Sequence, residues 1–395
     1  MKTKLLIASL AICTISNAGV WTQKTDFGGA ARHSAVSFSI GTKGYVGTGF
    51  DGTLRKDFWE YDPSGNTWTQ KVDFGGTARR SAAGIASLTK GYIGTGYDGA
   101  LRKDFWEYDP VGNIWVQKAD FGGTARQRTI VFFTDTSNCG TIYIGLGNDG
   151  SSKQDLWVYD PTTDIWSQKA NFLGGPRESA VSFSINTKGY VVTGYDGASL
   201  YQDLWEYVAS SNSWIQKANF PGLPREWSAG FSVGSKGYIG TGMGTPYSKD
   251  FWEWDQATNV WTQMANFGGT ARIQAVGFCI GSKGYIGLGV DSTGAIKSFY
   301  EFDPNATGIN EINNENSISI YPNPFSSATT ITTNKILKSA TLTIYSISGQ
   351  TVEQIKNVNG QTIILRRDNL PSGTYFLRLT LGNKVVAADK LVITD

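Results

Sequence analysis

The chain has 395 residues, a formal net charge of +2 and 17% charged residues. This balance excludes the clustered basic excess that nucleic-acid-binding proteins carry, so we expect no nucleic-acid partner. Aromatic residues make up 13% of the chain, and glycine occurs 48 times. Because glycine reaches positive φ in tight turns and aromatic side chains fill pleated surfaces, this mixture favours many short β-strands.

The first 18 residues have the features of an export signal. Lys2 and Lys4 precede an apolar run over 5–15, and small residues follow up to Ala18. A basic start, a short apolar stretch and a small-residue end predict a secretory signal peptide at 1–18. The apolar run is shorter than the roughly 20 residues of a membrane-spanning helix, so we expect no transmembrane segment.

Three residue series recur along most of the chain at intervals of 47 to 51 residues. Tryptophans that open a W-x-Q-[KM] segment lie at Trp21, Trp68, Trp115, Trp166, Trp214 and Trp261. A [KQ]-D-[FL]-W segment ends at Trp59, Trp106, Trp157, Trp205 and Trp252. An arginine follows Ala or Pro at Arg32, Arg79, Arg126, Arg177, Arg225 and Arg272. Three series in one phase indicate a repeat architecture.

Each repeat contains four strand-like segments. In one repeat they cover 81–87, 92–96, 105–108 and 114–117, and turn residues separate them. Four strands in a period of this length predict one blade of a β-propeller. The segment at 21–24 is a fourth strand with no partners ahead of it, and the last repeat ends near Pro304 without one. We therefore predict an all-β, six-bladed ring that the N-terminal strand closes, which leaves no open sheet edge.

The order of these strands resembles the kelch repeat over residues 21–304. The matching features are a small first strand, a glycine-containing second strand, a [DN]-x-W-x-[YW]-D third strand and a fourth strand led by Trp. Triplets such as Gly47-Thr48-Gly49 stand where kelch repeats have a diglycine. The resemblance implies a kelch-type propeller at 19–304, of the kind that forms the central domain of galactose oxidase.

The repeat phase ends after Pro304, and a polar segment at 305–316 is predicted to be a linker. Residues 317–395 contain about seven strand-like runs, which favour a small Ig-like β-sandwich. This segment resembles the type A sorting domain of the Bacteroidetes type IX secretion system. The matching segments are 321–324 (YPNP), 344–349 (IYSISG), 370–375 (LPSGTY) and 390–393 (KLVI). The resemblance implies secretion machinery as a partner of 317–395 and a secreted or outer-membrane location; an ordinary Ig-like adhesive module is the alternative.

Residue types limit the chemistry of the propeller. Its one histidine, His33, cannot supply the two histidine ligands that the copper-radical oxidases of the galactose oxidase family need. Histidine-based zinc and iron sites fail for the same reason. Cys139 and Cys279 lie in opposite repeats, so we expect no disulfide between them. We predict no metal, no cofactor and no evident catalytic centre; Glu178 and Glu226, which break the repeat, are weak candidates for acid–base catalysis.

The loops that join successive blades and the loops between second and third strands share one face of a propeller. Guanidinium and aromatic groups on that face suit an anionic sugar or a partner that carries carboxylates. The ligand-binding candidates are Arg32, Arg79, Arg80, Arg126, Arg128, Arg177, Arg225, Trp227, Arg272, Tyr97 and Tyr195. In the alternative interpretation, the six repeated arginines brace neighbouring loops.

Three functions fit this sequence. The first is a secreted or cell-surface binding module for glycans or proteins, because the scaffold is rigid and the loops vary. The second is a sugar mutarotase or epimerase resembling the six-bladed kelch mutarotases of sialic acid, whose reaction needs only acid–base groups. The third is an extracellular structural repeat protein without a small ligand.

Overall fold

The computed structural model describes residues 19–134, 140–306, 318–382 and 384–395. The chain divides into two compact units, Met1–Thr307 and Gly308–Asp395. The expected signal peptide at 1–18, most of the expected linker and Cys139 lie outside the described residues. In the described ranges the regular structure is strand apart from one 3₁₀ turn, Ala209–Ser211, and no helix is long and apolar enough to cross a membrane.

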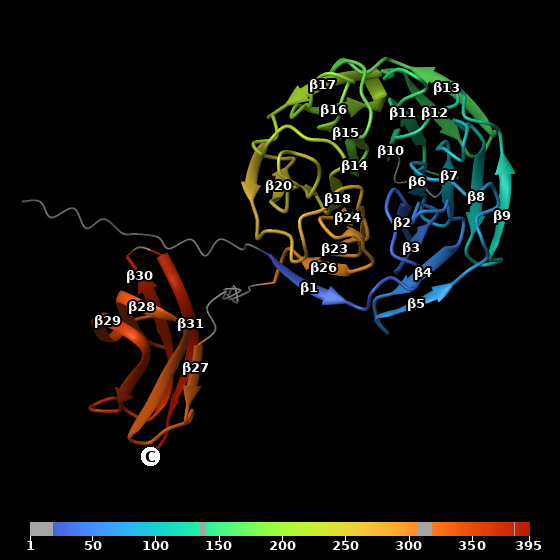
Figure 1. Cartoon of the computed structure of the whole chain (residues 1–395). Helices are drawn as coiled ribbons and strands as arrows, with labels where there is room; N and C mark the ends of the chain where they lie inside the picture. Colours follow the sequence, from blue (N-terminus) through green and yellow to red (C-terminus); the bar gives the residue numbers. More distant parts are fainter. Residues whose placement is uncertain (1–18, 135–139, 307–317, 383) are drawn as a thin grey trace, which may run out of the picture. The chain divides into compact units, whose positions relative to one another are not determined.

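The described part of the first unit contains six four-stranded sheets arranged as blades around a ring (Figure 1). Blade 1 has β2 (Val36–Ile40), β3 (Lys43–Gly47), β4 (Phe58–Asp62) and β5 (Thr67–Gln70). Blade 2 has β6 (Ala83–Ala86), β7 (Gly91–Gly94), β8 (Phe105–Asp109) and β9 (Ile114–Lys118). Blade 3 has β10 (Ile130–Phe133), β11 (Ile142–Gly145), β12 (Leu156–Asp160) and β13 (Ile165–Lys169). All pairs within these blades are antiparallel.

The other three blades repeat this order. Blade 4 has β14 (Val181–Ile185), β15 (Lys188–Val192), β16 (Leu204–Val208) and β17 (Ser213–Lys217). Blade 5 has β18 (Ala229–Val233), β19 (Lys236–Gly240), β20 (Phe251–Asp255) and β21 (Val260–Gln263). Blade 6 has β22 (Val276–Ile280), β23 (Lys283–Gly287), β26 (Phe299–Asp303) and, from the N-terminus, β1 (Val20–Lys24). A two-stranded hairpin of β24 (Val290–Asp291) and β25 (Gly294–Ala295) extends from this blade.

The N-terminal strand closes the ring, as the sequence predicted. β1 runs antiparallel to β26, with Val20 opposite Asp303 and Lys24 opposite Phe299. The Trp21 ring on β1 packs edge-on against Phe251 of blade 5 at a centroid distance of 4.9 Å. β1 covers the outer edge of β26, but β1 is now the outer edge strand of blade 6, as β5 is of blade 1. The expectation that closure leaves no open sheet edge is therefore wrong, because each blade is a separate sheet that keeps one short outer edge.

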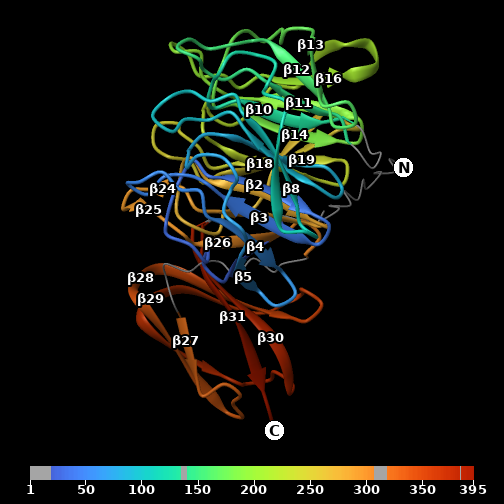
Figure 2. The same cartoon turned by 90° about the vertical axis from the view of Figure 1, so that its right-hand side faces the viewer.

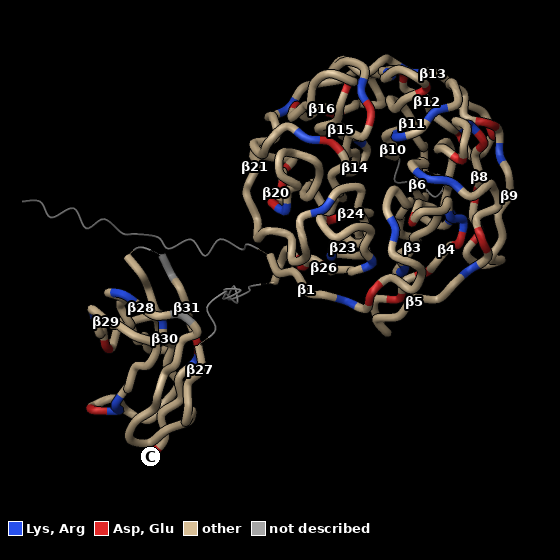
Figure 3. The backbone as a smooth tube through the Cα atoms, viewed as in Figure 1, with Lys and Arg blue, Asp and Glu red and all other residues tan. Residues whose placement is uncertain are grey.

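The blades adhere through aromatic side chains that repeat with the same period. Phe58 of blade 1 lies edge-on to Tyr108 and Trp115 of blade 2, at 4.9 and 5.1 Å between ring centroids. Burying each such ring contributes roughly 1.5–3 kcal/mol. The close approach also needs glycine, since a Cβ on Gly75 would lie 2.8 Å from the Trp106 ring. Basic and acidic residues are interspersed around the ring (Figure 3), and many of them form ion pairs within a blade.

The second unit is a five-stranded antiparallel sheet. Its strands are β27 (Ile318–Tyr321), β28 (Ala328–Ser346), β29 (Thr351–Arg366), β30 (Gly373–Leu381) and β31 (Lys384–Ile393). The long β28 and β29 run beside one another (Figure 2). Their pairing register shifts between Thr332 and Leu337, so each spans what the sequence pattern divided into shorter runs. This explains why five strands, and not about seven, form this unit.

Candidate functional site

Each blade buries one arginine in the loop before its innermost strand. In five blades the guanidinium forms a two-point ion pair with the aspartate that precedes the third-strand tryptophan. Between Arg79 and Asp104 both N–O distances are 2.6 Å, and the Trp106 indole N–H donates to the same carboxylate at 2.8 Å. The other four pairs are Arg32–Asp57, Arg126–Asp155, Arg177–Asp203 and Arg225–Asp250.

The six repeated arginines are buried. All six are at most 1% exposed: Arg32, Arg79, Arg126, Arg177, Arg225 and Arg272. Their geometry is that of a brace, because each guanidinium also donates to backbone carbonyls of its own loops, such as Thr95 O for Arg79. These six ligand-binding candidates therefore do not contribute to the ligand-binding surface around the collar.

Two residues after each arginine, six backbone hydrogen bonds form a closed ring. Each N–H donates to the carbonyl of the preceding member at 2.9–3.2 Å, and the first member closes the ring onto the last. The members, here called the collar, are Ser34, Ser81, Arg128, Ser179, Trp227 and Gln274. All six have φ between 53° and 58°. This left-handed conformation costs non-glycine residues roughly 1–3 kcal/mol, which the bonds between blades offset.

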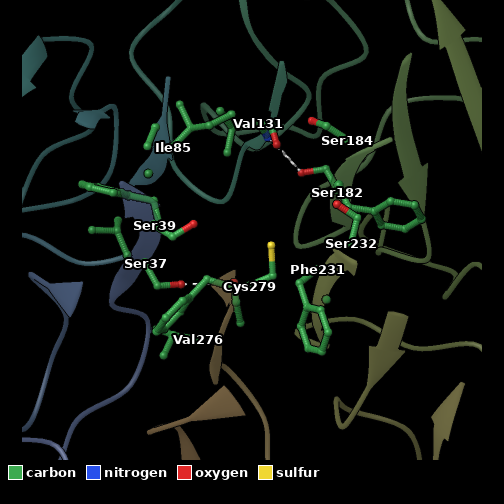
Figure 4. A pocket seen from close by; sticks show the side chains of 18 of the residues that line it. Ser37, Ser39, Ile85, Val131, Ser182, Ser184, Phe231, Ser232, Val276 and Cys279 are labelled. Atoms are coloured by element: carbon green, nitrogen blue, oxygen red, sulfur yellow. Dashed lines mark hydrogen bonds between the residues drawn. The ribbon is translucent and has the colours of Figure 1, made fainter. Parts of the chain in front are cut away.

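The collar surrounds one mouth of a central channel. The residue after each collar member, such as Ala35 or Ser228, lines the channel. The cavity has a volume of about 720 Å³, and the innermost strands of the six blades form its wall (Figure 4). Ser182 Oγ donates to the Val131 carbonyl at 2.8 Å, so this wall hydroxyl joins two blades. Burial raises the pKa of the Cys279 thiol, which keeps it neutral and a poor nucleophile.

Blades 3 to 5 break the symmetry of the collar with charged and aromatic side chains. Arg128 Nη1 lies 3.0 Å from Glu178 Oε2, and the Asn148 amide donates to Glu178 Oε1 at 3.3 Å. The Arg128 guanidinium also lies over the Trp227 ring, 5.5 Å from its centroid. Glu178 and Glu226 are 5% and 7% exposed. We call these five residues the collar site.

Three polar atoms of this site have no hydrogen-bond partner in the described part of the chain. Among the described residues, eight buried side-chain polar atoms have no hydrogen-bond partner, and three of them, Arg128 Nε, Glu226 Oε2 and Trp227 Nε1, belong to the collar site. Each such atom costs roughly 1–3 kcal/mol. Burial raises the pKa of Glu226, and the nearby Glu178 carboxylate adds to this, while Arg128 and Ser179 oppose it. Unpaired groups and a displaced pKa in one place are typical of functional sites.

The opposite side of the collar is aromatic. The Arg80 guanidinium lies between the rings of Phe50 and Tyr97, at 5.1 and 5.5 Å from their centroids. His33 Nδ1 lies 3.0 Å from the Ser34 hydroxyl. Burial lowers the pKa of His33, and the charge of Arg80 adds to this, so the imidazole is neutral near pH 7.

The structure thus brings several of the sequence candidates to one face. Arg80 and Tyr97 are backbone-bridged to each other, and so are Glu178 and Tyr195. The Tyr195 hydroxyl donates to the Gly197 carbonyl at 2.6 Å. Asn148 and the collar serines were not among the site residues that the sequence predicted. The signal for the collar in the sequence is its constant spacing, because each collar residue follows a repeated arginine by two positions.

Within the described ranges, no three His, Cys, Asp or Glu side chains group as metal ligands. Asp51 and Gly52 lie in the loop between β3 and β4. Asp51 accepts hydrogen bonds from Thr53 and Arg55, and the bond from Arg55 is the largest cause that lowers the pKa of Asp51 to about 2. Turn formation and ion pairing account for this carboxylate.

Comparison with protein-family models matches residues 319–394 to the secretion system C-terminal sorting domain. The second unit is a type IX sorting domain. The sorting domain directs export, and the protein is secreted or displayed at the cell surface. The search of curated proteins found no match.

The propeller unit resembles solved structures. One chain, titled "Structure of YjhT", is similar over 70% of this chain and 96% of its own length, with a TM-score of 0.59 and 15% identical residues. At this identity the likeness shows the β-propeller fold alone. The sorting domain therefore accompanies a propeller whose ligand must be inferred from its own residues.

Proposed function

We propose that this protein is an exported binding module, a six-bladed kelch-type propeller that holds a glycan or protein ligand at the collar site. The three buried polar atoms without partners carry this proposal. A ligand that supplies acceptors to Arg128 Nε and Trp227 Nε1 and a partner to Glu226 Oε2 would recover the free energy that these groups forfeit. The collar itself does not require Arg128 or Trp227, since Ser34 and Ser81 hold the same positions in blades 1 and 2.

Sugar hydroxyls fit this set of groups because each hydroxyl both donates and accepts. The Arg128 charge is already matched by Glu178, and the repeated arginines are buried. A neutral glycan therefore suits the collar site better than the anionic sugar that the arginine count favoured. On the other side of the collar, the Phe50–Arg80–Tyr97 stack offers a flat surface to a sugar ring or an aromatic side chain of a protein.

We propose residues 19–304 as the binding propeller, 305–316 as the linker, and 317–395 as an Ig-like, type A sorting module that contacts the secretion machinery. The signal peptide at 1–18 would carry the chain across the inner membrane. The propeller then acts outside the cell, where glycans and surface proteins are available.

The binding experiment measures thermal unfolding of the full chain against a panel of neutral, acidic and amino sugars. A sugar that binds only the folded chain raises the unfolding temperature. At 100 times its Kd it adds about 2.7 kcal/mol to the free energy of unfolding. Trp227→Phe keeps the ring and removes the indole N–H, so it should reduce the shift. Trp261→Phe is the matched control, because its N–H donates to the Ala218 carbonyl away from the collar. Equal shifts in both variants would exclude the collar site.

A second candidate, a sugar mutarotase, is favoured by one observation. Glu226 has a raised pKa, whereas the neighbouring Glu178 is held in an ion pair by Arg128. Two carboxyl groups in different environments can divide the roles of acid and base. If they do so, Glu226→Gln should abolish anomer interconversion in an NMR exchange assay and retain sugar binding. Unchanged exchange rates would exclude this activity, and no response to any sugar would leave the structural-repeat alternative.

A further inference from the structure

The arginine of blade 6 differs from its five counterparts. Arg272 is 1% exposed, yet among the described residues it forms no salt bridge within 4 Å. Ser298 stands where the other blades have aspartate, and Tyr300 stands where they have tryptophan. Arg272 Nη2 donates to Ser298 Oγ at 3.0 Å, and Nη1 donates to the Leu288 carbonyl at 3.2 Å. Its hydrogen bonds are met by neutral oxygens, but buried charges are normally paired.

The other blades show what this position is built to hold. In blade 1 the Asp57 carboxylate receives three N–H donors, Arg32 Nη1 at 2.5 Å, Arg32 Nη2 at 2.7 Å and Trp59 Nε1 at 2.8 Å. Three converging donors form a cradle for an anionic group. Blade 6 keeps both guanidinium donors, which turn to the Ser298 hydroxyl and, at 3.4 Å, to the Ser298 carbonyl in place of a carboxylate. The Tyr300 ring replaces the indole, with its centroid 5.8 Å from the guanidinium carbon of Arg272.

One carboxylate lies further off. Thr270 Oγ1 donates to Asp291 Oδ2 at 2.8 Å and accepts from Arg272 Nη2 at 3.3 Å. This relay also exists in blade 2, where Thr77 donates to Asp98 at 2.6 Å although Arg79 has a direct carboxylate partner. The relay is therefore a common part of the scaffold and no substitute for the missing aspartate. Burial lowers the pKa of Arg272 to about 10, although Tyr300 and Asp291 act against this.

We propose that Arg272, Ser298 and Tyr300 form a binding site for a small monovalent anion of the size of chloride or formate. The anion takes the place that an aspartate carboxylate holds in the other five blades. Ser298 and Tyr300 are only half-buried, which gives an ion access, and the exposed Lys297 adds positive charge beside the entrance. The anion stabilises the blade that β1 closes and is independent of ligand binding at the collar site.

The experiment measures the unfolding temperature of the full chain in chloride, formate and gluconate at equal ionic strength. Gluconate is the bulky reference anion. Chloride and formate should raise the unfolding temperature by roughly 2–4 °C over gluconate. An effect of formate alone would assign the site to carboxylates, and an effect of chloride alone to halides. Equal temperatures in all three salts would overturn the proposal.

Two variants separate the site from a general salt effect. Ser298→Asp supplies the carboxylate within the chain, so the unfolding temperature should be high in all three salts. Asp57→Ser recreates the blade 6 pairing in blade 1 and should add a second anion dependence. Chloride-35 NMR detects binding directly. The wild-type chain should broaden the chloride resonance, and Ser298→Asp should remove this broadening. Anion dependence that persists in Ser298→Asp would refute the assignment to Arg272.

Discussion

Replacing Asp104 by asparagine removes one charge from the buried brace of blade 2 and changes little else. The carboxylate receives three N–H donors, two from Arg79 and one from Trp106. Removing one partner of a buried ion pair costs 3–5 kcal/mol, because the other charge stays buried. The Asp104 side chain is 22% exposed, so water recovers part of this. We expect a loss of about 3 kcal/mol in the free energy of unfolding.

The assay is urea unfolding followed by tryptophan fluorescence. With a slope of about 3 kcal/mol per molar urea, the midpoint should fall by roughly 1 M. Asp109→Asn is the matched control, since Asp109 pairs with Lys90 at 2.8 Å on the exposed rim of the same blade, where ion pairs contribute little. If the Asp104 variant loses no more stability than the Asp109 variant, the ion pair between Arg79 and Asp104 does not brace the blade.

Three further predictions concern closure and pH. Trp21→Ala should lower the free energy of unfolding by about 3 kcal/mol, and Trp68→Ala, at the equivalent place in blade 1, should lower it by the same amount. Urea unfolding midpoints measure both losses. A negligible loss in Trp21→Ala would mean that β1 does not hold the ring closed. Glu226→Gln should raise the unfolding temperature at pH 7 and leave it unchanged below about pH 4, because a raised folded pKa gives stability that is lost as pH rises. Burial disfavours the charge of Asp104, yet the hydrogen bonds from Arg79 and Trp106 hold the folded pKa of Asp104 below its usual value. The stability that the carboxylate adds should therefore be lost as the pH falls below about 4. In a pH series, the unfolding temperature of Asp104→Asn should fall less steeply at acid pH than that of the wild-type chain.

The fold could be predicted because its determinants are periodic and local. The tryptophans at Trp21 and Trp261 fix the ends of the repeat, and the unpartnered strand at the N-terminus requires closure with the last blade. The second unit was harder, since a continuous strand such as β28 carries a bulge between Thr332 and Leu337 that reads as a turn in the sequence. A bulge and a turn both interrupt the alternation of apolar residues.

The candidate site was only half predictable. Glu178, Glu226 and Trp227 were found because they depart from the repeat. The sequence could not show that Arg128 pairs with Glu178, because these residues lie 50 positions apart and meet only across two blades. It also could not separate exposed from buried arginines, since Arg79 and Arg80 are neighbours in the chain and only the first turns into the blade.

The collar has a consequence for how the specificity of this propeller can change. Within the described residues, its six amides donate to its six carbonyls, so the amides are not free for a ligand and recognition at the mouth depends mainly on side chains. The six positions already tolerate serine, arginine, tryptophan and glutamine at the same φ. Substitutions at positions 34, 81, 128, 179, 227 and 274 should therefore exchange one ligand preference for another without disturbing the backbone. The collar is a natural place for a combinatorial library.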